Sequence, residues 1–305
     1  MSTRITGNMI SRSVLSDLND ISTRLAKTQE RMSSGKQITR PSDDPYGTSR
    51  ALSLSSDVAG TQQYQRNVSE ATAWENVTDA ALSKITDAVH RARELAVQGA
   101  SDSAGQSART AAAAEIDQLI ASVKQEANAS YGGRYVFSGT KTNVAPYDVT
   151  SASDAYSGDA GTVAREIGPG VSVQVNVRGV DLLGQGQLAS DGKLLNVLRD
   201  LSDHLKSGTV ADMNTLRTSD LKGLDTNLDA ISQARATVGA TTNRLESADS
   251  RLQEVEGSLT KLLSDVEDAD MAQTAVDYSM QQSVYQSALH AGANIVQQSL
   301  LDFLR

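Results

Sequence analysis

The chain has 305 residues and a formal net charge of −9, and it contains one Trp, two Phe and no Cys. The negative charge argues against nucleic acid and anionic membrane surfaces as partners, because both bind basic surfaces. The absence of cysteine excludes disulfides and thiolate metal sites. No segment approaches the roughly 18 consecutive apolar residues of a membrane span. Residues 1–20 also lack the apolar run of a signal peptide, so we expect no cleavable signal.

The first predicted helix covers residues 10–34 and ends before Gly35, a plausible C-cap. Its apolar residues recur at alternating spacings of four and three, with Thr28 as the one polar member of the series. Such spacing places a narrow apolar stripe along a helix, and another helix is needed to cover it. The stripe consists of Val14, Leu18, Ile21, Leu25 and Met32.

A turn-rich connector is predicted over residues 38–47. It holds Pro41, Asp43, Asp44 and Pro45. Two adjacent carboxylates could form a catalytic pair, but no base, metal ligand or phosphate-binding loop lies nearby. Carboxylates favour helix N-termini. We therefore interpret the acidic pair as capping residues of the next helix.

Long helices are expected after the connector, because no proline occurs between Pro45 and Pro146. The pattern predicts helix over residues 48–99 and 106–130, with a break at residues 101–105.

The pattern changes between residues 132 and 192, which contain half of the 22 glycines. Valines at positions 171, 173, 175 and 177 alternate with polar residues, which predicts a half-buried strand. The Gly-Pro-Gly segment at 168–170 separates it from residues 162–167, so a β-hairpin is expected. A short strand is also predicted at residues 135–137. These features indicate a small β insert in a helical chain.

Helix is predicted again over residues 193–207 and from residue 210 to the C-terminus. The last helix carries a second stripe, interrupted at Gln273, and ends in two leucines. The acidic residues 265–270 are expected to form a solvated face inside this helix, since an EF-hand-type ion loop requires a central glycine. The C-terminal stripe consists of Leu252, Val255, Leu259, Leu262, Val266, Val276, Met280, Leu300 and Leu301.

Together these elements predict a mainly α fold. The N- and C-terminal halves form a long antiparallel helical bundle or coiled coil, and a small β-rich domain is inserted at its tip. We divide the chain into a terminal coiled-coil assembly domain, a helical rod and the insert. The assembly domain is expected to be disordered in the monomer, because its stripes lack a covering surface. The ranges are 1–45 with 260–305, 46–131 with 193–259, and 132–192.

No group of residues predicts catalysis. His90, His204 and His290 are isolated on helical segments, and the sequence has no phosphate loop, zinc-binding His pair or Gly-x-Ser-x-Gly turn. We expect no enzyme activity, no metal site and no cofactor. The terminal stripes favour assembly, with each other or with neighbouring copies. The spacing alone leaves an ordinary intramolecular bundle as an alternative.

Several segments resemble motifs of the bacterial flagellin-like family. They lie in both helical halves and leave out most of the β insert. The matching segments are residues 31–36 (Arg-Met-Ser-Ser-Gly-Lys), 41–45 (Pro-Ser-Asp-Asp-Pro), 235–240 (Arg-Ala-Thr-Val-Gly-Ala), 243–246 (Asn-Arg-Leu-Glu), 268–272 (Asp-Ala-Asp-Met-Ala) and 298–304 (Gln-Ser-Leu-Leu-Asp-Phe-Leu).

Two groups within the family differ in role. Flagellins build the filament, and adaptor members form a short layer that joins the hook to the filament. The proline-flanked acidic pair, the segment 134–140 (Arg-Tyr-Val-Phe-Ser-Gly-Thr) and the Leu-Leu-Asp-Phe-Leu ending are similar to the adaptor group. A short flagellin that forms the filament itself is the alternative.

The resemblance implies a secreted structural protein of the bacterial flagellum, exported unfolded through the type III channel. The implied partners are identical copies in a ring, a neighbouring hook-associated protein, flagellin, and an export chaperone on the C-terminal region. Nucleic acid and membrane are not expected. An enzyme or an adhesin carried by the insert would be another class of function, but the insert contains no His and its acidic residues show no arrangement above chance.

Overall fold

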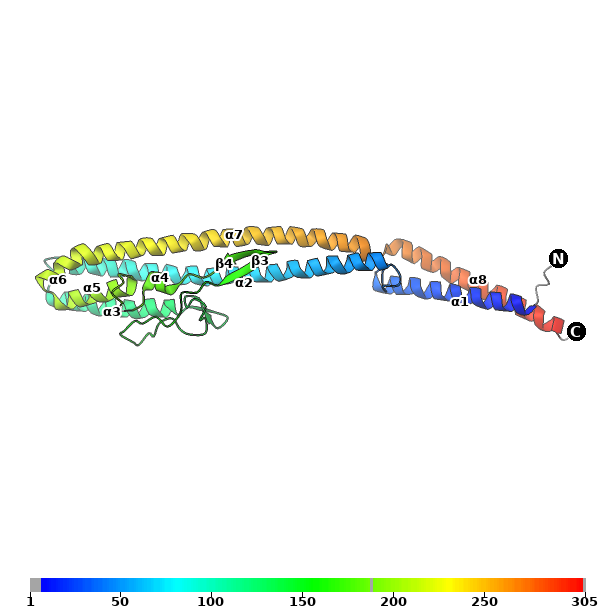
Figure 1. Cartoon of the computed structure of the whole chain (residues 1–305), viewed down its shortest axis with the longest axis horizontal. Coiled ribbons are helices and arrows are strands. Elements are labelled where there is room, and N and C mark those ends of the chain that lie inside the picture. Colours follow the sequence, from blue (N-terminus) through cyan, green and yellow to red (C-terminus); the bar gives the residue numbers. More distant parts are fainter. Residues whose placement is uncertain (1–6, 187–188, 304–305) are drawn as a thin grey trace. The chain divides into compact units, whose positions relative to one another are not determined.

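The computed structural model describes the backbone of residues 7–186 and 189–303, and side-chain burial for residues 9, 12–186 and 189–293 (Figure 1). The chain divides into two compact units. Unit 1 comprises Met1–Gly60 and Val255–Arg305, and unit 2 comprises Thr61–Glu254. The mainly helical class, with long helices and short antiparallel strands, is as predicted. The three-part division expected from the sequence stays a prediction.

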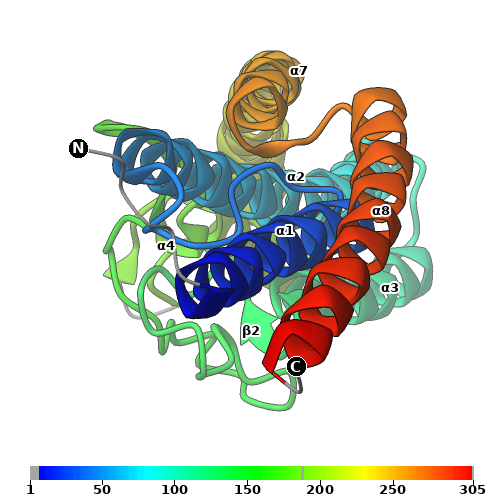
Figure 2. The ribbon, with the colours of Figure 1, turned by 90° about the vertical axis from the view of Figure 1, so that its right-hand side faces the viewer.

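Unit 1 is built on two helices from opposite ends of the chain, α1 (Gly7–Ser34) and α8 (Met271–Phe303). They lie side by side and antiparallel, as the blue and red ribbons of Figures 1 and 2 show. The unit also holds the start of α2 (Pro45–Gly99) and the end of α7 (Leu221–Glu267).

The C-terminal half is not one continuous helix, which corrects the sequence prediction. A π-helical turn, η2 (Leu216–Asp220), follows α6 (Val210–Thr215), and α7 and α8 are separated at residues 268–270. The second break has a clear cause. Asp270 Oδ1 accepts hydrogen bonds from the backbone N–H groups of Ala272 (2.9 Å) and Gln273 (3.1 Å), so it caps α8. The acidic run therefore ends one helix and begins another.

Unit 2 packs four helices around one core. α2 and α7 run antiparallel and are joined by ion pairs of Arg235 with Asp79 (2.9 Å) and Arg93 with Asp225 (2.7 Å). After the predicted break at residues 101–105, α3 (Gln106–Ala127) folds back, and α5 (Leu194–Ser207) packs on it. Every buried apolar side chain in the described residues lies between Val68 and Leu252.

The insert contains two short antiparallel sheets. β1 (Ser130–Tyr131) pairs with β2 (Arg134–Tyr135), and β3 (Ala164–Gly168) pairs with β4 (Val171–Gln174). The predicted hairpin is confirmed, with a register shift between Glu166 and Gly168. Its second strand ends at Gln174, before the predicted end at residue 177. A short helix, α4 (Gly179–Leu183), completes the insert.

The insert lies along the side of unit 2 instead of at its tip, which corrects the expected position. Asn67 on α2 donates a hydrogen bond to the Glu166 backbone carbonyl on β3 (2.9 Å). The reason is the length of α3. Its 22 residues run back from the turn at 100–105 by about 33 Å before the insert begins.

A buried ion network fastens the insert to the helices. Lys124 Nζ on α3 lies 2.8 Å from Asp154 Oδ1, and both side chains are 1% exposed. Lys124 also donates to the backbone carbonyls of Asp148 and Ser151, so each of its three N–H groups has an acceptor. Arg199 Nε on α5 donates to the other oxygen of Asp154 (2.8 Å).

Candidate assembly surface

The predicted N-terminal stripe faces α8. Val14, Leu18, Ile21, Leu25 and Met32 are all half-buried along α1. Thr28, the polar member of the series, is only 7% exposed, and its Oγ1 donates a hydrogen bond to Gln281 Oε1 on α8 (2.8 Å). The stripe is therefore covered in part, and a polar contact lies in the middle of it.

The side of α8 that carries Gln281 is mixed in character. It includes the buried residues Thr274 and Gly292, and the half-buried residues Tyr278, Tyr285 and Ala288 lie on the same side. A Cβ at Gly292 would lie 3.1 Å from Val14 Cγ1, so the two helices approach closely there because this position has no side chain.

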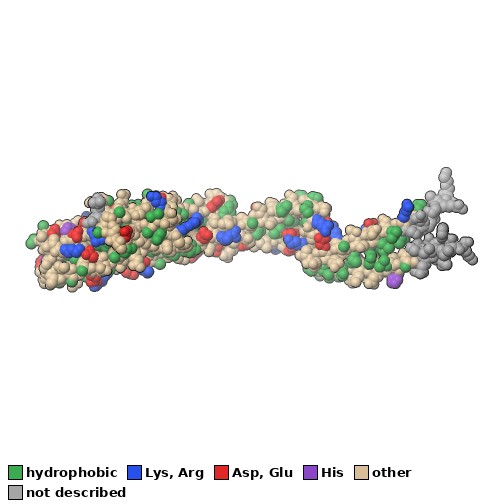
Figure 3. Space-filling model, turned by 90° about the horizontal axis from the view of Figure 1, so that it is seen from below, with side chains coloured by type: hydrophobic (Ala, Val, Ile, Leu, Met, Phe, Trp, Pro, Cys, Tyr) green, Lys and Arg blue, Asp and Glu red, His purple; other side chains and the backbone are tan. Residues whose placement is uncertain are grey.

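The larger apolar side chains of α8 point away from α1. Val276 is 62% exposed and Met280 is 59% exposed, and Val284 continues the row one turn further on. At about 100° per residue this row is centred roughly 100° around α8 from Gln281, so it flanks the side that meets α1. On α1, Met9 and Leu15 are also exposed. Figure 3 shows the green side chains that gather on this helix pair.

Unit 1 has no apolar core of its own in the part of the chain that the structure describes. Its buried residues there are Thr28, Gly47, Thr274 and Gly292. Ordering a residue costs about 1–2 kcal/mol of backbone entropy, and apolar burial returns about 25 cal/mol per Å². A helix pair whose apolar residues are only half-buried or exposed gains less from burial than a closed core does, so a further surface would stabilise it.

The remaining stripe residues are spread over two environments. Leu252 is buried within unit 2, whereas Val255 and Leu262 are exposed and Leu259 and Val266 are half-buried in unit 1. The side chains of Leu300 and Leu301 lie outside the described residues. The structure thus brings the N-terminal stripe to α8, but it does not place Val276 or Met280 against that stripe.

The connector positions the start of α2. Asp44 Oδ1 accepts hydrogen bonds from the N–H groups of Tyr46 (3.1 Å) and Gly47 (2.9 Å), and Pro45 is the first helical residue. The predicted capping role is confirmed for Asp44. A Cβ at Gly47 would collide with the side chains of Asp44 and Ile38, so a larger residue would displace the capping carboxylate.

The neighbouring residues of the connector hold it to α1. Asp43 pairs with Lys27 on α1 (2.7 Å), and this hydrogen bond and charge lower the pKa of Asp43 below its usual 3.8. Pro41 is exposed. The connector is thus a structural link between α1 and α2.

A short backbone bridge, which was not predicted from the sequence, joins the segment that follows α1 to the segment that precedes α8. Gln37 N–H donates to the Glu267 carbonyl (2.7 Å), and Ala269 N–H donates to the Gly35 carbonyl (2.9 Å). Lys36 Nζ lies 2.5 Å from Glu267 Oε1. Gly35 has φ +71°, which favours glycine at this turn. The opposite charges of Lys36 and Glu267 were the available sequence signal.

The described residues contain no group of three or more His, Asp or Glu side chains placed to hold a metal ion. Nor do any of their helices combine the length and apolar character of a membrane span. His204, which the sequence analysis called isolated, has its Nδ1 2.6 Å from Asp220 Oδ2. This pair joins α5 to η2.

Family models match both helical ends of the chain. The bacterial flagellin N-terminal helical region matches residues 5–142, and the bacterial flagellin C-terminal helical region matches residues 221–304. Together the two matches cover well over half of the sequence and leave out most of the insert.

Individual relatives share more than a quarter of their residues with this chain. Flagellar hook-associated protein 3 of Escherichia coli is 29% identical, covering 87% of this chain and 88% of that protein. Flagellin FlaB2 of Treponema pallidum is 28% identical, covering 92% of each. A solved structure described as a flagellar hook-associated protein, from Vibrio parahaemolyticus, has a TM-score of 0.67 at 21% identity, covering 74% of this chain and all of that one. The chain belongs to the bacterial flagellin family.

Proposed function

We propose that this chain is a structural component of the bacterial flagellum that joins the hook to the filament. The observation that carries the proposal is the outward-facing row of Val276, Met280 and Val284 on a helix pair without an apolar core in the described residues. Exposed apolar patches of this kind mark interaction sites. The similarity to flagellar hook-associated protein 3 supports the adaptor role over the filament role.

In this proposal, neighbouring subunits supply the surface that α8 lacks. Identical copies would form a ring in which the α1–α8 pair of each copy packs against the next. The hook-associated protein on one side and flagellin on the other would contact the two ends of the layer. The half-buried N-terminal stripe and the exposed residues Val255 and Leu262 would complete these contacts.

Export fits the same feature. A helix that exposes Val276 and Met280 in the monomer risks premature association. We propose that a dedicated chaperone covers the C-terminal region in the cytoplasm until the chain is secreted unfolded to the growing flagellum. The complete absence of cysteine is compatible with passage through a narrow channel, since no disulfide can form.

The proposal is tested in a strain that lacks the gene, by electron microscopy of the cell surface and by assaying flagellin in the medium. Hooks without filaments, with abundant flagellin shed into the medium, are expected for an adaptor. If filaments are lost and no flagellin remains in the medium, the chain is the filament subunit and the adaptor role is wrong.

A further inference from the structure

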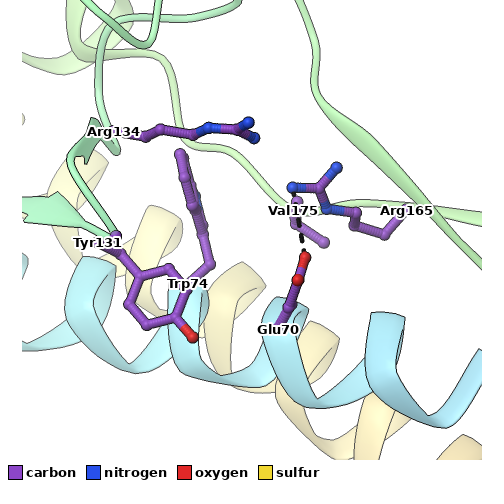
Figure 4. Close-up of a pocket in the computed structure, with 7 residues that line it drawn as sticks. Glu70, Trp74, Tyr131, Arg134, Arg165 and Val175 are labelled. Carbon is purple, nitrogen blue, oxygen red and sulfur yellow. Dashed lines mark ion pairs between the residues drawn. The ribbon is translucent and has the colours of Figure 1, made fainter.

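Unit 2 carries a basic hollow where the insert meets α2 (Figure 4). Its volume is about 320 Å³, and it is lined by Glu70 and Trp74 on α2, Tyr131 and Arg134 of the first sheet, Arg165 on β3, and Val175. Trp74 is only 4% exposed and forms the floor with Val175. In Figure 4 the Arg134 side chain passes over the end of the indole ring.

The two arginines of this hollow are poorly neutralised. Arg165 Nη2 lies 3.8 Å from Glu70 Oε2, a long contact with an exposed carboxylate. Arg134 has no ion pair within the described part of the chain. Two guanidinium groups beside an aromatic floor therefore favour a carboxylate on a short aliphatic stem, which is the chemistry of Asp and Glu side chains.

An acidic hollow lies between α2 and α7. It measures about 520 Å³ and is lined by Thr72 and Asn76 on α2 and by Glu246, Asp249 and Ser250 on α7. Asp249 accepts one hydrogen bond, from Gln253 Nε2 (2.6 Å). Neither Glu246 nor Asp249 forms an ion pair with another described residue.

Both hollows are at the same level of α2. The basic one uses Glu70 and Trp74, and the acidic one uses residues 68–76 of the same turns. At 3.6 residues per turn the two groups are centred roughly 150° apart around the helix. One copy of the chain therefore offers a basic surface on one side and an acidic surface on nearly the opposite side.

We propose that neighbouring copies of this chain meet side by side through these surfaces, with Arg134 and Arg165 of one copy against Glu246 and Asp249 of the next. A contact between two different patches of the same chain is heterologous, and repetition of it closes a ring or continues a helix. The inference rests on the proposed function, because it requires assembled copies. The charge pairs would mainly fix the register of adjacent subunits.

The natural lack of cysteine makes the contact directly testable. The full chain would carry Tyr131→Cys and Ser250→Cys, which leave all four charged residues in place. Hook–filament particles from cells expressing it would be treated with a short bismaleimide and separated on a denaturing gel. We expect a ladder of cross-linked copies, at least tenfold above a control that combines Tyr131→Cys with Thr226→Cys. Thr226 lies about 36 Å from Ser250 along α7. Ser69→Cys, another position in the acidic hollow, would replace Ser250→Cys as an independent probe.

Exchanging the charges of the two surfaces tests whether they interact directly or only lie near each other. Adding Arg134→Glu or Glu246→Arg alone should lower the cross-linked fraction at least fivefold, and the two together should restore it. Circular dichroism of each purified variant checks that helix content is unchanged. If the wild-type chain is present in the particles but neither cysteine pair gives a ladder, the lateral contact is wrong and the proposed function stands. If the wild-type chain is absent from the particles, both fall.

Discussion

Glu75 gives unit 2 a stability that should fall as the pH rises. Its side chain is 3% exposed on α2, and Oε2 has no hydrogen-bond partner in the described residues. Burial of the charged form raises the pKa of this carboxyl from 4.5 to about 8. In the folded chain Glu75 is therefore largely protonated at neutral pH, whereas in the unfolded chain it is ionised.

The sign of the effect follows from proton binding. Between pH 4.5 and about 8 the folded state holds a proton that the unfolded state has lost, so the free energy of unfolding decreases with rising pH. The contribution is complete below pH 4.5 and is lost by about pH 8. At 1.36 kcal/mol for each pH unit the total is at most about 5 kcal/mol. Water that reaches the carboxylate would reduce this figure.

The single tryptophan provides the assay, because Trp74 adjoins Glu75 and reports on unit 2. Urea unfolding of the full chain would be followed by its fluorescence at several values between pH 5 and 8. Glu75→Gln removes the ionisation. The difference between its free energy of unfolding and that of wild type should therefore increase in favour of the variant by up to about 1.4 kcal/mol for each unit of rising pH. Glu70→Gln, at an exposed position, is the control and should follow wild type. Parallel pH profiles for wild type and Glu75→Gln would refute the reasoning.

Three further predictions concern assembly and the insert. Replacing Val276 and Met280 by Asp should abolish incorporation into hook–filament particles while leaving the Trp74 unfolding transition unchanged, and the exposed control Gln282→Asp should incorporate normally; equal incorporation would contradict the assembly role of that row. Asp154→Asn should destabilise unit 2 by about 3–5 kcal/mol, because Lys124 and Arg199 would lose their shared carboxylate; a loss below 1 kcal/mol in urea unfolding would show that the network is dispensable. Asp270→Ala removes the α8 cap and should lower helix content near residue 271 at a cost of about 1 kcal/mol, measured by hydrogen exchange of Ala272 and Gln273; unchanged exchange would contradict the capping role.

Much of the fold could be predicted because local signals were strong. Proline-free stretches predicted the long helices, the glycine-rich segment predicted the insert, and Gly-Pro-Gly at 168–170 predicted the hairpin. The break at residues 268–270 was missed, because Asp270 reads equally well as part of an acidic helix face and as a cap. Only the bridge between residues 35–37 and 267–269 decides between these, and that bridge joins residues far apart in the sequence.

The predicted position of the insert was wrong for a similar reason. Its place in the middle of the sequence suggested the tip of a hairpin, but the tertiary path of α3 sets where it lies. Lys124, a residue that usually stays in solvent, is buried there because it has three acceptors within reach, one of which is the Asp154 carboxylate. No pattern in the sequence joined Lys124 to Asp154 and Arg199.

The assembly surface shows what periodicity can and cannot determine. Alternating spacings of three and four residues predict one apolar face on a helix, and both terminal stripes were predicted in this way. The spacing does not say which surface covers that face. Thr28 and Gln273, which interrupt the two stripes, behave differently: Thr28 lies buried against Gln281, whereas Gln273 is exposed beside Val276. The face of α8 that meets α1 combines a hydrogen-bonding residue, Gln281, with Gly292, which permits close approach. The half-buried Tyr278 and Tyr285 lie on the same face. Val276, Met280 and Val284 stay exposed on α8, and a monomer that buried them would lose three of the apolar side chains with which α8 can contact its neighbours.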